Sequence, residues 1–70
     1  MIYAIYCIEN PCCNKTGYWF LGGEDEEKNW CKSKPIDKGI INLNYVYQCL
    51  EMLYNKHQSC KCSFEIRIIG

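Results

Sequence analysis

The sequence lacks an excess of either charge, and it lacks a long hydrophobic run. Its 70 residues hold eight basic and eight acidic side chains, so the formal net charge is zero. This balance argues against a protein that binds nucleic acid by general electrostatic attraction, which needs a basic excess. No apolar run approaches the roughly 20 residues that span a membrane. No basic region precedes the apolar start MIYAIYCI, so we expect no targeting segment and a soluble, cytoplasmic protein.

Catalytic signatures are also scarce. His57 is the only histidine, and Cys60 is the nearest cysteine that it could activate as a nucleophile. No third group that would orient such a pair is evident, and no oxyanion-hole motif accompanies it. Gly22 and Gly23 precede acidic residues rather than a helix start, so they do not form a phosphate-binding loop. The sequence therefore predicts a protein that is not an enzyme and carries no cofactor.

Cysteine, in contrast, is abundant. Seven residues in a secreted chain would indicate a disulfide framework. Three features argue against it: the odd number, the missing signal peptide, and two cysteines inside predicted regular elements, where a small hydrophobic residue also fits. The seven are Cys7, Cys12, Cys13, Cys31, Cys49, Cys60 and Cys62.

Four of these cysteines could instead bind zinc. Cys12 and Cys13 follow the first predicted strand, and Cys60 and Cys62 precede the last one. If these two strands run antiparallel, the two cysteine pairs approach each other and offer four ligands. Adjacent cysteines and a C-x-C pair are less favourable for zinc than C-x2-C pairs. A small zinc-stabilised module is therefore the alternative interpretation.

Residues 42–57 carry the sustained helical period of the chain. Asn42 is a suitable N-cap, because its side-chain oxygen can accept an N–H group of the first turn. Polar residues occupy the opposite face of this segment. The period predicts a helix whose core stripe is centred on Leu50 and consists of Leu43, Val46, Tyr47, Leu50, Leu53, Tyr54 and His57.

Alternating apolar residues predict strands on both sides of this helix. Residues 1–9 are apolar on both faces, which is typical of a central strand. Residues 17–22, GYWFLG, form an aromatic strand bounded by glycines. Residues 62–69 alternate, with the inward positions occupied by Cys62, Phe64, Ile66 and Ile68.

The connection between the second strand and the helix carries two weaker signals. Residues 33–38, with Ser33 as cap and Pro35 near the start, predict a short helical turn, and residues 39–41 predict a short strand. The resulting order is β–β–(short α–β)–α–β. We therefore expect a single domain over residues 1–70 with an α+β fold: two layers, one main helix and a mostly antiparallel sheet of three or four strands.

A second stripe of the predicted helix is not needed for its core. It consists of Tyr45, Cys49 and Met52, while Tyr3 and Ile5 lie on a sheet face that no second helix is available to cover. Aromatic and methionine side chains on a surface favour protein interfaces. These residues predict a partner-binding surface, and a homodimer is one form of it. The alternative is a broad core face that buries more of the helix.

The acidic run Glu24, Asp25, Glu26 and Glu27 could also dock on a basic partner, although such runs are more often solvated loops. Trp30 and the lysines around it could form a small patch for single-stranded nucleic acid. The zero net charge argues against that interpretation. The lysines concerned are Lys28, Lys32, Lys34 and Lys38.

The overall pattern is GYWFLGG, then a tryptophan, a short capped turn, a short strand, an Asn-capped helix and a final alternating strand. It resembles small phage-encoded α+β proteins. The resemblance implies an intracellular accessory protein, and some proteins of this kind block a host defence by binding one of its components. We therefore expect a non-enzymatic protein-binding module, with the inhibition of a host protein implied by the resemblance.

Overall fold

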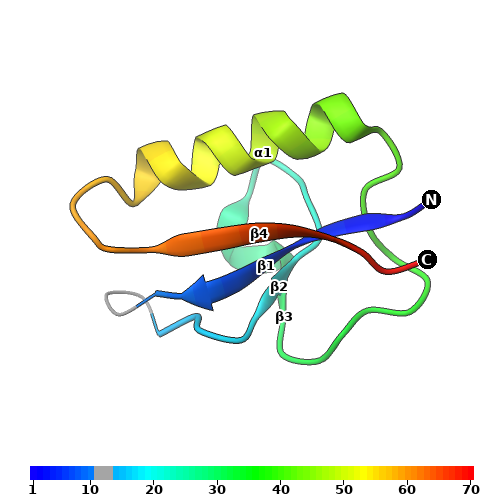
Figure 1. The fold of residues 1–70 in the computed structure, drawn as a ribbon, viewed down its shortest axis with the longest axis horizontal. Helices are drawn as coiled ribbons and strands as arrows, with labels where there is room; N and C mark the ends of the chain where they lie inside the picture. Colours follow the sequence, from blue (N-terminus) through cyan, green and yellow to red (C-terminus); the bar gives the residue numbers. More distant parts are fainter. Residues whose placement is uncertain (11–13) are drawn as a thin grey trace.

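A computed structural model describes residues 1–10 and 14–70 as one four-stranded antiparallel sheet with one main helix packed on it (Figure 1). The strand order is β3-β2-β1-β4, so β1 is central and β4 forms an edge. This arrangement confirms the α+β fold expected from the sequence. The elements are β1 (Tyr3–Glu9), β2 (Trp19–Phe20), the 3-10 helix η1 (Glu26–Asn29), β3 (Trp30–Cys31), α1 (Leu43–Lys56) and β4 (Ser63–Ile68).

Strand β1 is buried on both faces, as its apolar sequence predicts. Ile5 and Cys7 point toward α1 and belong to the core, while Ala4 is fully buried on the opposite face. Ile5 pairs with Phe20 of β2 on one side and with Ile66 of β4 on the other. The core therefore lies between the centre of the sheet and the helix.

Helix α1 begins where the sequence places its cap. The Asn42 side-chain oxygen accepts hydrogen bonds from the N–H groups of Asn44, at 2.9 Å, and Tyr45, at 3.4 Å. The helix buries Val46, Cys49 and Leu53 against the sheet. Both the bounds of this helix and its capping residue are thus confirmed.

The connection before α1 differs from the expectation. Residues 33–38 form bends and no helix, so the predicted helical turn is wrong. One short turn must fix several backbone angles for a single hydrogen bond, and a local cap signal does not offset that cost. The predicted strand over residues 39–41 is reduced to one bridge, in which Tyr3 and Ile40 exchange N–H···O bonds of 2.7 and 2.8 Å.

The sheet face opposite α1 is closed by its own side chains. Tyr6 and Trp19 pack with their ring centroids 4.7 Å apart. The guanidinium carbon of Arg67 lies 4.0 Å from the centroid of the Tyr6 ring and 5.6 Å from that of Trp19. Cation–π contacts of this kind stabilise an exposed arginine by about 0.5–1 kcal/mol. This face is therefore a packed surface of aromatic rings under a charged group.

The two ends of the described chain lie side by side (Figure 1). The Ile2 N–H group donates to the carbonyl of Gly70 at 2.7 Å, and the Ile69 N–H group donates to the carbonyl of Ile2 at 2.8 Å. These bonds extend the pairing of β1 with β4 beyond the strands themselves. Within the described residues, no helix combines the length and the apolar character needed to cross a membrane.

Candidate functional site

The second helix stripe proposed from the sequence is mostly covered. Cys49 is a core residue with 4% of its surface exposed, and Met52 is half-buried against the core. Tyr45 is more open, but its hydroxyl accepts a hydrogen bond from the Gly23 N–H group at 3.1 Å. The expectation of an exposed stripe through Cys49 is wrong, because α1 turns this side toward the sheet. A pocket of about 240 Å³ remains beside Tyr45 and Met52.

The two β1 residues assigned to an uncovered sheet face lie on the covered one. Ile5 is fully buried in the core, and Tyr3 is half-buried and packs against it. The expectation that this face is open is wrong, because the single helix takes the face that carries the odd-numbered residues of β1. The other face carries Ala4 and Tyr6, beneath the side chain of Arg67.

The acidic run contacts the end of α1 through Glu26 and His57. The Glu26 Oε1 atom lies 2.6 Å from the His57 Nε2 atom, and these side chains are 15% and 9% exposed. Glu24, Asp25 and Glu27 are exposed. The sequence did not reveal this contact, because its two residues are 31 positions apart and neither belongs to a motif. The run is therefore not a wholly solvated loop.

A pocket of about 340 Å³ lies beside this pair, between Lys15, Trp30 and the acidic run. A carboxylate that holds an imidazole in one orientation is one part of a catalytic constellation. Among the described residues that line the pocket, none carries a hydroxyl or thiol that could act as the nucleophile. The Glu26–His57 pair therefore holds the loop against the helix.

The predicted zinc ligands are not assembled by the described part of the chain. Cys60 is disulfide-bonded, and a sulfur in a disulfide does not offer the thiolate that zinc requires. Cys62 donates a weak hydrogen bond to the Asn10 side-chain oxygen at 3.3 Å. Cys12 and Cys13 lie outside the described residues. No cluster of three or more metal-ligating side chains occurs within residues 1–10 and 14–70.

The disulfide at Cys60 also corrects the argument from cysteine count and composition. An odd number of cysteines leaves an unpaired thiol, but it does not exclude a bond between two of the others. Cys7 and Cys49 are buried in the core, as expected for small hydrophobic residues. The expectation of small hydrophobic cysteines is therefore confirmed for Cys7 and Cys49, whereas Cys60 forms a disulfide.

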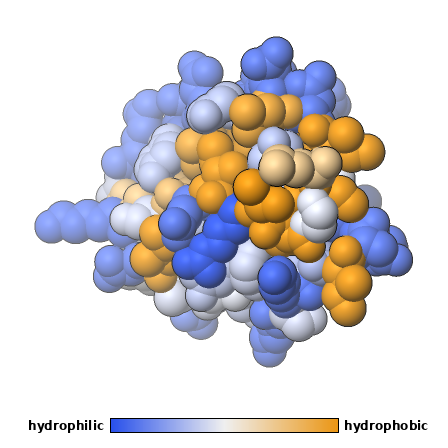
Figure 2. All heavy atoms as spheres, turned by 45° about the vertical axis from the view of Figure 1, so that its right-hand side comes forward, coloured by the Kyte–Doolittle hydropathy of each residue, from blue (hydrophilic) through white to orange (hydrophobic). Residues whose placement is uncertain are grey.

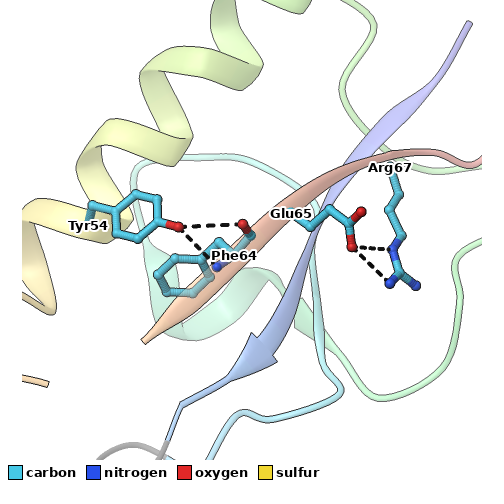
Figure 3. A network of polar contacts seen from close by, with 4 residues as sticks. All are labelled: Tyr54, Phe64, Glu65 and Arg67. Carbon is cyan, nitrogen blue, oxygen red and sulfur yellow. Dashed lines mark hydrogen bonds and ion pairs between the residues drawn. The ribbon is translucent and has the colours of Figure 1, made fainter. Parts of the chain in front are cut away.

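Among the residues that the structure describes, strand β4 has a sheet neighbour on one side, β1. The Ile69 N–H group points to β1, where it bonds to Ile2. The Phe64 N–H and C=O groups point the other way, to the Tyr54 hydroxyl at 3.2 and 3.4 Å (Figure 3). Backbone groups alternate in direction along a strand, so those of Ile66 and Ile68 also point away from β1. The outer edge of β4 thus presents backbone donors and acceptors.

Exposed apolar side chains flank this edge. Ile68 is 58% exposed at the end of β4. On α1, Tyr47, Tyr54 and Leu43 are 56%, 43% and 40% exposed. Figure 2 brings the chain ends and the start of α1 forward, and it shows several hydrophobic residues gathered on that side. We call the outward-facing backbone of Ile66 and Ile68, together with these four side chains, the β4 edge surface.

The periodicities of the sequence predict every side chain of this surface to lie in the core. Leu43, Tyr47 and Tyr54 belong to the predicted helix stripe centred on Leu50, and Ile68 was an inward position of the last strand. The alternation of β4 does separate the buried Phe64 from the exposed Glu65 and Arg67. The alternating pattern does not show that β4 lies at the edge of the sheet. That position leaves the end of β4, with Ile68, uncovered.

Comparisons with protein-family models, with curated proteins and with solved structures find no match.

Proposed function

We propose that this protein is a non-enzymatic protein-binding module that receives an extended segment of its partner along the outer edge of β4. The observation that carries the proposal is the β4 edge surface itself. An edge strand with outward backbone groups is a template for another strand. In such complexes main-chain hydrogen bonds supply affinity, and side chains on alternate positions supply specificity.

The side chains beside the edge support an apolar partner segment. A strand added next to β4 would place every second side chain on the α1 side of the sheet. There it would meet Tyr47, Leu43 and the neighbouring Ile68, which are exposed in the chain as it stands. Tyrosine is enriched at protein interfaces because it offers a large apolar ring and a polar tip.

Of the two tryptophans, Trp30, which was suggested for nucleic-acid binding, is partly engaged, and Trp19 is buried. Trp30 packs on Phe20 with ring centroids 5.2 Å apart, and Trp19 is 8% exposed beneath Arg67. Trp30 is half-buried, so it offers a base less ring surface than an exposed tryptophan would. This favours protein binding over single-stranded nucleic-acid binding. Inhibition of a host protein stays a prediction from the resemblance to phage-encoded proteins.

A peptide-binding experiment tests the proposal. Peptides selected from a random library against the dilute protein are expected to carry apolar residues at alternate positions. Their binding should slow hydrogen exchange at the Ile66 and Ile68 amides, because these would become donors to the added strand. Substitution of Ile68 by lysine should abolish binding. The matched control is Ile36→Lys, in the loop before α1, where the side chain is 85% exposed.

Two results would overturn the proposal. The first is a set of selected peptides that bind while leaving exchange at both β4 amides unchanged. The second is equal loss of binding in the Ile68→Lys and Ile36→Lys proteins, which would show a general effect of added charge.

A further inference from the structure

We infer that one occupant of the β4 edge is a second copy of this chain, paired β4 to β4 in antiparallel fashion about a two-fold axis at Ile66. This inference rests on the proposed use of the β4 edge and names the partner. It makes the protein a symmetric dimer in which two four-stranded sheets join into one continuous sheet. Backbone direction, charge and the side chains of α1 support this dimer.

Backbone direction allows this pairing without a change of fold. A two-fold axis perpendicular to the sheet makes the two edge strands antiparallel and keeps both helices on the same face. The N–H and C=O groups of Ile66 point away from β1, by alternation from Phe64. Ile66 of each copy can therefore exchange both hydrogen bonds with Ile66 of the other.

Charge selects this register over its neighbours. With the axis at Ile66, Glu65 of each copy lies opposite Arg67 of the other, in the pair type whose Cα atoms are closest, about 4.5 Å. Within one chain the Arg67 Nε and Nη2 atoms already lie 3.2 and 2.9 Å from the Glu65 Oε2 atom. The dimer would thus close a ring of four alternating charges. An axis at Arg67 would instead place the two arginines opposite each other, which is unfavourable.

The exposed side chains of α1 have the size that the dimer requires. Helix α1 packs chiefly against β1, and the two β1 strands would lie three strand spacings apart, about 14 Å. Close helix–helix contact occurs at about 8–10 Å, so large side chains must fill the remaining gap. Tyr47 and Tyr54 are exposed on this side of α1, and Leu50 is half-buried between them.

Tyr54 competes with the second copy for the backbone groups of Phe64. In the Ile66 register Phe64 faces Ile68 of the second copy, and both would exchange backbone hydrogen bonds. The Tyr54 hydroxyl now holds the Phe64 N–H and C=O groups (Figure 3). It must release them when the strands pair. We therefore expect Tyr54→Phe to tighten the dimer several-fold, and weaker association in that variant would overturn this register.

Charge reversal gives the decisive experiment. Sedimentation velocity compares four samples: wild type, Glu65→Arg, Arg67→Glu and an equimolar mixture of the two variants. Protein concentrations up to about 1 mM make dissociation constants of that order detectable. Each variant alone places like charges opposite each other twice, so its association should fall roughly tenfold or more. The mixture should form a heterodimer, because every opposed pair is then of opposite charge.

Circular dichroism checks that both variants fold. If either does not, Ile68→Lys against Ile36→Lys replaces them, with dimer loss expected in the first alone.

Three outcomes overturn the inference: a monomer at every concentration, a dimer that both charge variants leave unchanged, and variants that fail to associate when mixed. The peptide experiment separates this failure from failure of the proposed function. A monomeric protein whose Ile66 and Ile68 amides are still protected by a selected peptide loses the dimer and keeps the binding function. The opposite result is a dimer whose charge variants behave as expected, in a protein that binds no selected peptide. It would support the dimer and overturn the binding of a foreign segment.

Discussion

Gly22 occupies a backbone position, just after β2, that no other residue type fits well. Its φ angle is +92°, in the left-handed region that favours glycine. A Cβ atom there would lie 2.8 Å from the Ile40 Cγ1 atom and 3.4 Å from the Tyr45 ring. We expect Gly22→Ala to lower the free energy of unfolding by about 1–2 kcal/mol because of backbone strain. Overpacking beside Ile40 should lower it by about 1–3 kcal/mol more. Urea unfolding followed by tryptophan fluorescence measures the loss.

Gly17 provides the matched control for this substitution. Its φ angle is +86°, but an added Cβ atom would meet nothing closer than the Tyr6 hydroxyl at 3.9 Å. Gly17→Ala should therefore lose stability from backbone strain but not from overpacking. Equal losses in the two variants would contradict the role given to the contact between Gly22 and Ile40.

At this scale the sequence predicts what depends on neighbouring residues. The glycines around GYWFLG were expected to bound a strand, and Gly17 and Gly22 do adopt positive φ angles there. The Glu26–His57 contact could not be predicted in the same way, because its 2.6 Å distance exists only after the acidic run folds back on α1. Ordinary residue types at large sequence separation carry no local signal.

The N-cap of α1 is the strongest element-level prediction that the structure bears out. Removing the Asn42 side chain leaves the N–H groups of Asn44 and Tyr45 without the acceptor that they now share. We expect Asn42→Ala to lower the free energy of unfolding by about 1 kcal/mol, while Asn42→Asp keeps most of it. Thermal unfolding followed by circular dichroism at 222 nm checks both changes.

Asn44 gives the opposite sign within the same turn. Asn44 is exposed within the helix. Because alanine has a higher helix propensity than asparagine, Asn44→Ala should raise the free energy of unfolding by about 0.5 kcal/mol. A loss of stability at both asparagines would mean that the first turn responds to any substitution. The cap itself would then not be the cause.

The helix also shows where an element can be predicted and its packing cannot. The period gave the correct bounds, but the buried side is centred near Val46 and Leu53 and extends to Cys49, a rotation of roughly 60° from Leu50 at 100° per residue. The helical period counts tyrosine and cysteine alike as apolar, so it does not set this angle. The small Cys49 fits against the sheet, whereas Tyr47 and Tyr54 keep their hydroxyls near water.

On the scale of the whole molecule, the sheet order follows from a few predicted features. An apolar first strand favours the centre, and a last strand after a helix can pair beside it. The short β2 and β3 pair through only two residues each, so their existence depends on the assembled sheet rather than on propensity. A chain of this size buries a smaller fraction of its surface on folding than a larger domain does, and small domains often need a covalent staple.

The disulfide at Cys60 is such a staple, and it supports the last prediction. Reduction should lower the free energy of unfolding by about 2–4 kcal/mol, because it restores conformational freedom to the unfolded chain. Alkylation in denaturant without reductant should modify Cys31 and Cys49, which are free thiols, and spare Cys60 until a reductant is added. The unfolding midpoint with and without reductant gives the stability change, with Cys31→Ser as the control for loss of a single thiol. Alkylation of Cys60 before reduction would contradict the bond. Since native disulfides persist in oxidising compartments, a confirmed bond would also count against the cytoplasmic location expected from the sequence.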